Sequence, residues 1–422
     1  MNSPEQPTPP RAARCVIRLT GWGALLLTGA LLAPWGVLIW WRTTERRAPV
    51  AVTPAPRLPA VTGITRTRPG PWGDLELTRI MLEPPREFIS TQFDYGPTRW
   101  FFRGATPASL SLQLATLPWT EAQRQEVLNQ QQWEIGPSGI TILPSAELVL
   151  SLSPDLRAAL YEILRTDPAN STQHMPARFR GDTADEWFAN SALPPPTLAL
   201  LKQLVYRRGN ALLFSDPQVV LPRLSSDDER VAVLKVLGRK VSLLVQLRLH
   251  PDTNLDEVIR YWERGGRNKD IEPLLRSLPR PPGGFALDIA HLLPRFARGL
   301  LYTYPEPNSD ADRVQRDCHW TSLNFFASTP NDQFADEAVA TAKLRNDYYP
   351  IVGDPTFGDI IVFQRSNGLV YHSCVYIAAD IVFTKNGRTP QTAWQLMQLA
   401  DLLPWYADDP DVTVRAYRQR AQ

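Results

Sequence analysis

The chain has 422 residues, of which 43% are hydrophobic and 13 are tryptophan, so it can bury a substantial core and is not a wholly disordered protein. Its 45 basic and 43 acidic residues leave a net charge of +2, and this balance argues against a nucleic-acid partner. The length exceeds what one hydrophobic core usually reaches, which predicts two or three structural units.

The first feature along the chain is an uncharged apolar stretch at residues 19–41. A helix of this length would be about 34 Å long, enough to cross the ~30 Å hydrocarbon core of a bilayer. Trp40 and Trp41 lie at its outer end, where indoles favour the membrane interface. The stretch therefore predicts a transmembrane helix, with a cleaved signal peptide and a buried core helix as alternatives. A signal peptide would normally end in small residues, whereas this stretch ends in Trp-Trp-Arg.

The segments on either side of this stretch suggest a single-pass membrane protein. Residues 1–18 form a short basic head that we expect in the cytoplasm, with the C-terminal domains outside it. Arginines flank the apolar stretch on both sides, so the orientation rests on the usual behaviour of a short head before one span. Residues 42–74 are rich in proline and predict a semi-rigid, largely extended spacer.

Residues 75–300 predict a mainly helical domain. The clearest helix is 226–249, where acidic residues open the first turn and apolar residues recur at three- and four-residue steps. Another runs over 153–165, with Ser153 as N-cap and Pro154 at the first helical position. Further helices are expected at 120–131, 197–207, 255–264, 271–278 and 287–301. The region has no His/Cys cluster at metal-ligand spacing, and its sequence identifies no protein partner.

The first residues that indicate chemistry are Asp317 and Cys318. Asp317 suits an N-cap, and Trp320 and Phe326 then fall on one face of a short helix. Cys318 would lie at the helix N-terminus, where the macrodipole and free N–H groups favour a thiolate. His319 is expected to be a surface neighbour rather than the base, because adjacent helical residues point about 100° apart.

Three strands in a meander are predicted to follow this helix, at 357–364, 369–377 and 381–387. His372 lies early on the middle strand, 54 residues after Cys318. A helix laid across an antiparallel sheet would bring these two residues together. A cysteine beside a histidine is the arrangement that activates a thiol nucleophile.

These elements resemble the NlpC-type cell-wall cysteine peptidases and the related CHAP amidases, which have a papain-like fold. The matching residues are Asp317-Cys318 at the start of a helix, Gly358-Asp359 before an apolar strand, and His372 followed by Val375-Tyr376-Ile377. The resemblance covers about residues 300–390. It implies a C-terminal papain-like α+β domain at 301–422, in which the cysteine helix packs on an antiparallel sheet.

The resemblance also implies a substrate and an oxyanion site. The substrate would be an amide in peptidoglycan, within the stem peptide or at its junction with the sugar. Tyr302 or Tyr304 would match the tyrosine that such enzymes place near the oxyanion. The chain departs from the family after the cysteine, where His319-Trp320 replaces the usual Ser-Gly.

A third polar residue that orients the imidazole is expected on the strand after His372. If residues 378–380 form a three-residue turn, His372 lies opposite Asn386, whose side chain can accept a hydrogen bond from the ring. Thr384 shares that face and is the alternative orienting residue. A turn one residue shorter would move Asn386 off the face.

Together these residues predict acyl transfer without a metal or other cofactor. The Cys318 thiolate would attack an amide carbonyl, and His372 would protonate the leaving amine. Asn386 would hold the ring, and the Cys318 N–H would join the oxyanion hole. The predicted protein is therefore a membrane-anchored cysteine peptidase or amidase.

Three alternatives remain open. A Cys318–Cys374 disulfide in an oxidising compartment would silence the nucleophile. A degenerate papain-like domain would instead belong to a noncatalytic, membrane-anchored interaction or scaffold protein, whose middle region recruits a partner. A transglutaminase-like site uses the same order of cysteine, histidine and acidic residue, but Asp380 falls in the expected turn rather than on the strand beside His372.

Overall fold

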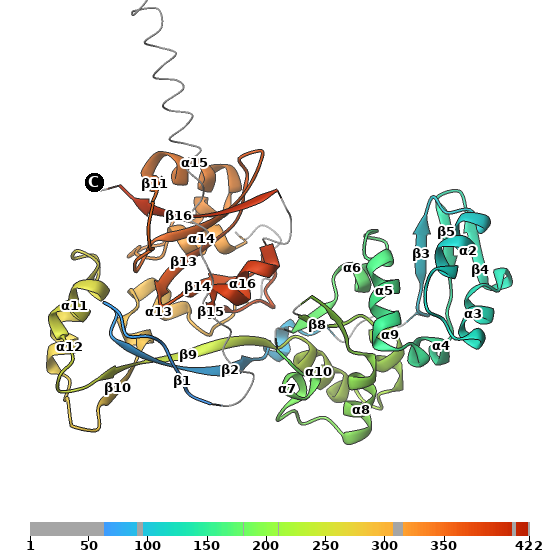
Figure 1. The fold of residues 1–422 in the computed structure, drawn as a ribbon, viewed down its shortest axis with the longest axis horizontal. Helices are drawn as coiled ribbons and strands as arrows, with labels where there is room; N and C mark the ends of the chain where they lie inside the picture. Colours follow the sequence, from blue (N-terminus) through green and yellow to red (C-terminus); the bar gives the residue numbers. More distant parts are fainter. Residues whose placement is uncertain are drawn as a thin grey trace, which may run out of the picture. The chain divides into compact units, whose positions relative to one another are not determined.

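The computed structural model describes residues 63–90, 96–179, 181–209, 211–306, 315–406 and 411–420 (Figure 1). All of them belong to one compact unit, residues 52–422. The predicted basic head (1–18), membrane helix (19–41) and most of the spacer lie outside the described residues. Within the described part, no helix is both long and apolar enough to cross a membrane.

The middle of the chain is not mainly helical, so that prediction is wrong. It contains two three-stranded antiparallel sheets and most of a four-stranded one. The strands of the first three-stranded sheet, in spatial order, are β3 (Trp100–Arg103), β5 (Gly139–Ile142) and β4 (Trp133–Gly136). Those of the second are β6 (Ala177–Phe179), β8 (Ala211–Phe214) and β7 (Tyr206–Arg208). The four-stranded sheet consists of β1 (Thr65–Arg66), β2 (Asp74–Leu82), β9 (Lys240–Leu249) and β10 (Phe285–Asp288). Strands of three or four residues carry too little alternation to be recognised from sequence.

Helices connect these strands, and most of the predicted ones are confirmed. The α-helices are α2 (Pro107–Ala115), α3 (Glu121–Val127), α4 (Ala146–Ser151), α5 (Pro154–Leu164), α6 (Ser171–His174), α7 (Ala184–Phe188), α8 (Pro195–Leu204), α9 (Pro217–Val220), α10 (Asp227–Leu237), α11 (Leu255–Glu263), α12 (Ile271–Ser277) and α13 (Arg295–Leu300). Short 3-10 helices lie at η1 (Arg86–Phe88), η2 (Gln130–Gln132), η3 (Leu221–Arg223) and η4 (Ile289–Leu292). Ser153 caps α5 as expected, since its side chain accepts from Leu156 N.

The predicted helix at 226–249 is wrong in its second half, which is strand β9. Gly238 ends α10, and a Cβ at this position would meet Pro84 Cγ at 2.7 Å. Beyond it, alternate residues over 243–249 are buried, and the strand pairs with β2 along its length. A leucine-rich run fits both the helical and the strand period, so pairing with β2 decides between them.

The predicted helix at 287–301 is likewise divided. Its first residues belong to β10 and to the 3-10 helix η4, and α13 begins only after Pro294. Proline has no N–H to donate to the preceding turn, so η4 cannot continue through it.

One hydrophobic core joins residues on both sides of the domain boundary predicted at 300 and 301. Leu77 and Leu247 contribute to it from β2 and β9, and Trp320 and Phe383 from the C-terminal part. A second core is formed entirely by residues between 100 and 237. Residues 240–300 therefore share their packing with the C-terminal part of the chain.

The C-terminal part is built on a six-stranded antiparallel sheet. Its strands, in spatial order, are β11 (Tyr348–Pro350), β16 (Val412–Gln419), β12 (Ile360–Arg365), β13 (Val370–Ala378), β14 (Ile381–Lys385) and β15 (Trp394–Gln398). Helices α14 (Cys318–Leu323) and α15 (Glu337–Asp347) pack on one face, through Trp320 and Leu344, and the 3-10 helix η5 (Asp332–Ala335) lies between them in sequence. Helix α16 (Leu399–Tyr406) packs on the opposite face through Leu402 (Figure 1).

The β13–β14 hairpin has a different turn from the one expected, but the expected register. Residues 379–380 form a two-residue turn with positive φ values of 48° and 60°, as in a type I′ turn. The register then shifts between Tyr376 and Ala378, and this irregularity restores the pairing of Val375 with Phe383. The pairing of the two strands ends there, so toward the open end of the hairpin they separate.

Candidate functional site

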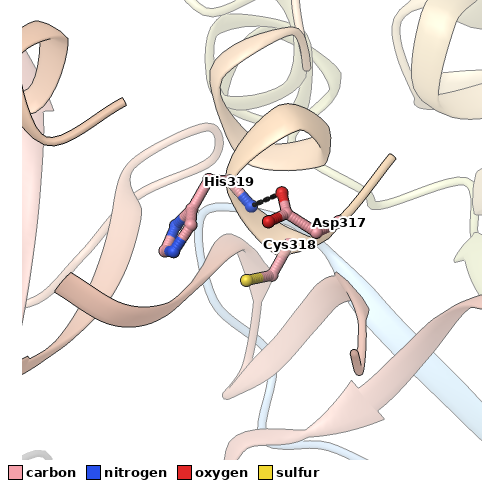
Figure 2. Close-up of side chains that lie close together, drawn as sticks. All are labelled: Asp317, Cys318 and His319. Atoms are coloured by element: carbon pink, nitrogen blue, oxygen red, sulfur yellow. Dashed lines mark hydrogen bonds between the residues drawn. The ribbon is translucent and has the colours of Figure 1, made fainter. Parts of the chain in front are cut away.

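Cys318 is the first residue of α14, and the residue before it caps the helix as predicted. Asp317 Oδ1 accepts from the backbone N of His319 at 2.9 Å and of Trp320 at 3.0 Å (Figure 2). Cys318 is only 7% exposed. Its side chain therefore lies, mostly buried, at a capped helix N-terminus.

Contacts with the sheet hold α14 in place. Trp394 Nε1, on β15, donates to Thr321 Oγ1 at 2.9 Å, and the Trp320 ring packs against Phe296 and Trp394. Ser373 Oγ, on β13, donates to the Cys318 carbonyl over 3.3 Å. The start of the helix is thus tied to β13 at the residue that follows His372.

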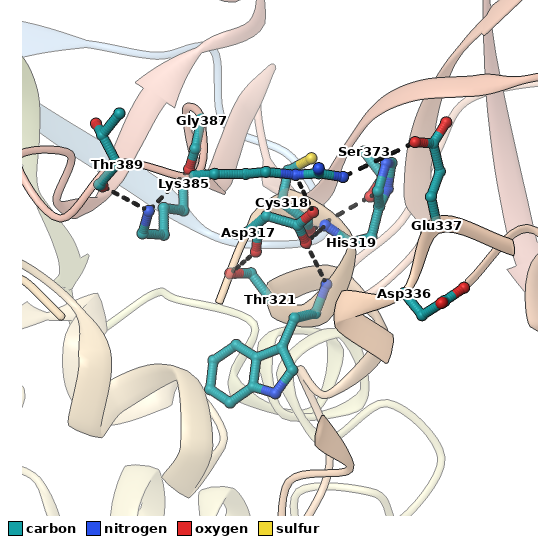
Figure 3. Close-up of polar contacts among 12 residues, drawn as sticks. Asp317, Cys318, His319, Thr321, Asp336, Glu337, Ser373, Lys385, Gly387 and Thr389 are labelled. Atoms are coloured by element: carbon teal, nitrogen blue, oxygen red, sulfur yellow. Dashed lines mark hydrogen bonds and ion pairs between the residues drawn. The ribbon is translucent and has the colours of Figure 1, made fainter. Parts of the chain in front are cut away.

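His319 is buried, so the prediction that it lies on the surface is wrong. Its Nδ1 is 3.0 Å from Ser373 Oγ, and the ring is held between α14 and β13 (Figure 3). Burial lowers the pKa of His319, against smaller opposing effects of Asp317 and Glu337. Adjacent helical residues point about 100° apart, so the His319 side chain does point away from that of Cys318. It points toward the sheet, however, and not toward solvent.

His372 lies on the opposite face of β13 from Ser373, in contact with α16. Its ring stacks on Tyr406 with centroids 3.8 Å apart and meets the edge of Phe363 at 5.4 Å. Only 1% of the residue is exposed. Nε2 lies 3.3 Å from Thr384 Oγ1, whereas the buried Nδ1 has no hydrogen-bond partner.

Thr384, rather than Asn386, contacts the imidazole. The Thr384 hydroxyl donates to Asn386 Oδ1 over 3.0 Å, so its lone pairs are what remain for His372 Nε2. Asn386 Nδ2 in turn lies 3.0 Å from Met397 Sδ, which fixes the orientation of the amide. This chain of contacts assigns the proton of a neutral His372 to Nε2 and leaves a lone pair on Nδ1.

Cys318 lies close enough to side chains on both faces of the sheet to act on them electrostatically. After burial, a charge on Cys318 is the next cause that raises the pKa of Cys374 and of Tyr406, which lie on the His372 face. The same charge also acts on Lys385, on the α14 face. No hydrogen bond joins Cys318 to His372 in the described part of the chain.

The remaining predicted residues lie as follows. Cys318 and Cys374 are both free thiols, so the alternative disulfide is not formed. Tyr302 donates its hydroxyl to the Leu243 carbonyl over 2.5 Å, and burial raises the pKa of this phenol. The Tyr304 hydroxyl is buried without a partner, and its ring lies 6.3 Å from that of Phe88. The contacts of both tyrosines are therefore with the strand β9 and the loop after β2, not with Cys318.

Three consecutive side chains here offer metal-ligand atoms. One atom each of Asp317, Cys318 and His319 lies within 4.8 Å of the others (Figure 2). Two of the three are engaged in other bonds: Arg388 Nε approaches Asp317 Oδ2 at 3.4 Å, and Ser373 lies beside the His319 ring. A cation at this point would have to compete with the guanidinium of Arg388.

Sequence reasoning overlooked Ser373, Tyr406 and Lys385. Ser373 and Lys385 stand in apolar strands, where a polar residue is unusual, and this was the signal that could have identified them. Tyr406 lies on a helix that the sequence did not link to His372. Comparison of the chain with protein-family models, with curated proteins and with solved structures found no match.

Proposed function

We propose that this protein is a thiol hydrolase that cleaves an amide bond with Cys318 as nucleophile and His372 as base. The observation that carries the proposal is the chain of contacts from Asn386 through Thr384 to His372, which leaves a buried, unprotonated Nδ1 without a partner. A buried nitrogen without a hydrogen-bond partner destabilises the fold, and a role in chemistry is one reason for a protein to keep it. Cys318, at the capped start of α14, is tied to the same strand through the hydrogen bond from Ser373 to its carbonyl.

The reaction proceeds by acyl transfer. His372 Nδ1 takes the proton of the Cys318 thiol, and the sulfur attacks the amide carbonyl. The C–N bond breaks as His372 returns the proton to the departing amine. Water, activated by the same nitrogen, then releases the acid and restores the thiol. Thr384 keeps Nε2–H in place throughout, and Asn386 orients Thr384.

The substrate class follows from the resemblance of residues 300–390 to the cell-wall cysteine peptidases. We infer a peptide amide of peptidoglycan, either within the stem peptide or where that peptide joins the sugar. Neither a metal nor another cofactor takes part in the proposed steps.

The test uses the full-length protein and purified peptidoglycan, with released amines and fragments measured by mass spectrometry. Cys318→Ala and His372→Gln, which keeps most of the buried volume of the ring, are each expected to lower the cleavage rate by at least about a thousandfold in protein that still unfolds cooperatively. His319→Asn is the matched control, because it removes the other buried imidazole while keeping a group that can bond Ser373. Cleavage that survives Cys318→Ala would overturn the proposal.

One observation favours a second candidate, the noncatalytic interaction protein. Cys318 is 7% exposed and makes no hydrogen bond to His372, as expected if the site were inert. In that case the folded protein would not react with iodoacetamide at Cys318 after reduction. Rapid alkylation of Cys318 would exclude an inert thiol.

A further inference from the structure

A small cavity lies where α15 packs against the six-stranded sheet. Its volume is about 220 Å³, and its walls come from α15, β11, β12, β16 and the start of β13. Leu344, Val362 and Val370 form its apolar side, at the point where the helix meets the sheet. Drug-sized ligands occupy pockets of ~300–1,000 Å³, so this cavity fits a smaller molecule.

Two arginines line the same cavity from different elements. Arg345 lies in the last turn of α15, and Arg420 directly follows β16. The backbone N–H of Arg420 donates to the Asp347 carbonyl at 2.8 Å, which holds the end of β16 against the end of α15. The fold therefore brings both guanidinium groups to one cavity.

The protein itself does not neutralise these two charges. Within the described ranges, neither Arg345 nor Arg420 forms an ion pair. The nearby Asp347 carboxylate is bonded to Lys343. Arg420 lies over the Tyr349 ring, 5.9 Å from its centroid, in a contact that does not use its N–H groups. Arg345 also complements the negative end of the α15 dipole, but Arg420 has no such role. An anion in the cavity would balance both arginines.

Two hydroxyl groups add hydrogen-bond donors to the walls. The buried Oγ1 of Thr341, on α15, has no hydrogen-bond partner. By contrast, the Thr321 and Ser322 hydroxyls of α14 each donate to the carbonyl four residues earlier, at 2.6 and 2.9 Å. Burial raises the pKa of Tyr348 to about 12, so its hydroxyl stays protonated and can donate. A ligand oxygen would supply the acceptor that Thr341 lacks.

We propose that this cavity binds a small organic carboxylate, whose anionic head is held by Arg345 and Arg420 and whose body packs on the apolar side. Guanidinium groups match a carboxylate through two parallel N–H bonds. An inorganic anion would leave the apolar side unfilled, and an uncharged apolar molecule would leave both arginines unbalanced. Cys318 does not line the cavity, so the proposal is independent of the hydrolase.

The test titrates the full-length protein with 4-fluorobenzoate, a compact aromatic carboxylate, and follows the ligand by fluorine NMR. Saturable binding with a Kd of about 1 mM or lower is expected. Arg345→Gln and Arg420→Gln should each weaken it about tenfold, because each removes a charge-assisted contact. Both side chains are exposed, so neither change should unfold the protein. Arg280→Gln, at an exposed site in the loop after α12, is the matched control and should leave the Kd unchanged.

Three results would overturn the inference. They are no saturable binding, a Kd that both Arg345→Gln and Arg420→Gln leave unchanged, and equally tight binding of 4-fluorobenzyl alcohol or of inorganic phosphate. Cys318→Ala should bind 4-fluorobenzoate as the unmodified protein does. Loss of peptidoglycan cleavage and loss of carboxylate binding are therefore separate outcomes, each of which tests one proposal.

Discussion

Thr384 occupies the position behind the His372 ring that the sequence assigned first to Asn386. A hydroxyl that donates to Asn386 can only accept from His372, so it selects the Nε2–H tautomer. The amide acts one step further away, through the hydroxyl. Removing the Thr384 hydroxyl should therefore lower the rate of cleavage more than removing the Asn386 amide.

Thr384→Val is expected to reduce peptidoglycan cleavage about a hundredfold, since the ring loses its fixed tautomer while the volume of the side chain is kept. Thr384→Ser, which restores the hydroxyl, should recover most of the rate. The measurement is the pH dependence of cleavage, which should broaden in the valine variant. If Thr384→Val and Asn386→Leu lowered the cleavage rate equally, the proposed order of contacts, from Asn386 through Thr384 to His372, would be contradicted.

The local sequence predicts the placement of several candidate site residues. The Asp317 cap follows from local rules, and the shared face of His372, Thr384 and Asn386 follows from strand alternation. The burial of His319 and the contact with Tyr406 could not be inferred. Both depend on which elements pack on each face of the sheet, which is information that a local pattern does not carry.

At the scale of elements, Asp359 joins three parts of the fold. Its carboxylate is 1% exposed and accepts from Arg264 at 2.8 Å, from Arg418 at 3.0 and 2.7 Å, and from Thr356 N at 2.8 Å. These bonds link the end of α11, the turn before β12 and strand β16. The Gly-Asp pair that resembles a cell-wall peptidase motif thus holds the sheet to the preceding helices.

Asp359→Ala is expected to destabilise the protein by about 3 kcal/mol, because two partly buried guanidinium groups lose their carboxylate. The measurement is urea unfolding followed by tryptophan fluorescence. Asp354→Ala, an exposed aspartate in the same loop, is the matched control and should change stability by less than about 0.5 kcal/mol. A similar loss of unfolding free energy in both variants would show that changes in the loop, and not the loss of the buried ion pairs, cause the destabilisation.

Elements were predictable where their ends are marked chemically. Ser153 and Pro154 define the start of α5, whereas β9 was taken for the end of a helix because its leucines satisfy two periods. The β13–β14 hairpin kept the predicted register only because a shorter turn and a local shift compensate each other. Such a shift arises from strand pairing and has no sequence signature.

At the scale of the whole molecule, the partly buried Lys240 and the buried Lys385 tie stability to pH. Burial lowers the pKa of Lys240 and of Lys385 to about 8, below the value of about 10.5 expected in the unfolded chain. Between these values the unfolded state binds more protons than the folded state, so stability rises with pH. Buried tyrosines, such as Tyr206 with its pKa raised to about 12, act in the opposite direction above pH 10.

The free energy of unfolding is therefore expected to increase by about 1 to 2 kcal/mol from pH 7.5 to pH 9.5 and to fall again above pH 10. Urea unfolding at constant ionic strength would measure this. The double variant Lys240→Met and Lys385→Met should lose the rise. A flat profile in the unmodified protein would mean that folding lowers the pKa of neither lysine.

Domain boundaries were the least predictable feature. The sequence divided the chain at residue 300, but Tyr261 donates its hydroxyl to the Ile377 carbonyl over 2.7 Å and Ser242 bonds the Leu396 carbonyl over 3.0 Å. Residues on both sides fill one core. Sequence composition indicates a linker only where the linker is exposed to solvent. Around residue 300 the chain is packed into the shared core, so composition gives no sign of a boundary.

The pairing of β2 with β9 has one more consequence. Leu82 and Lys240 face each other at the end of this ladder, so everything from residue 83 to residue 239 leaves and re-enters the fold at neighbouring points. In topological terms, that segment stands where the tip of a β-hairpin would be. A short Asn-Gly loop could take its place. A smaller version of this protein that keeps the six-stranded sheet is thus designed by excising an interior segment rather than by trimming the chain from one end.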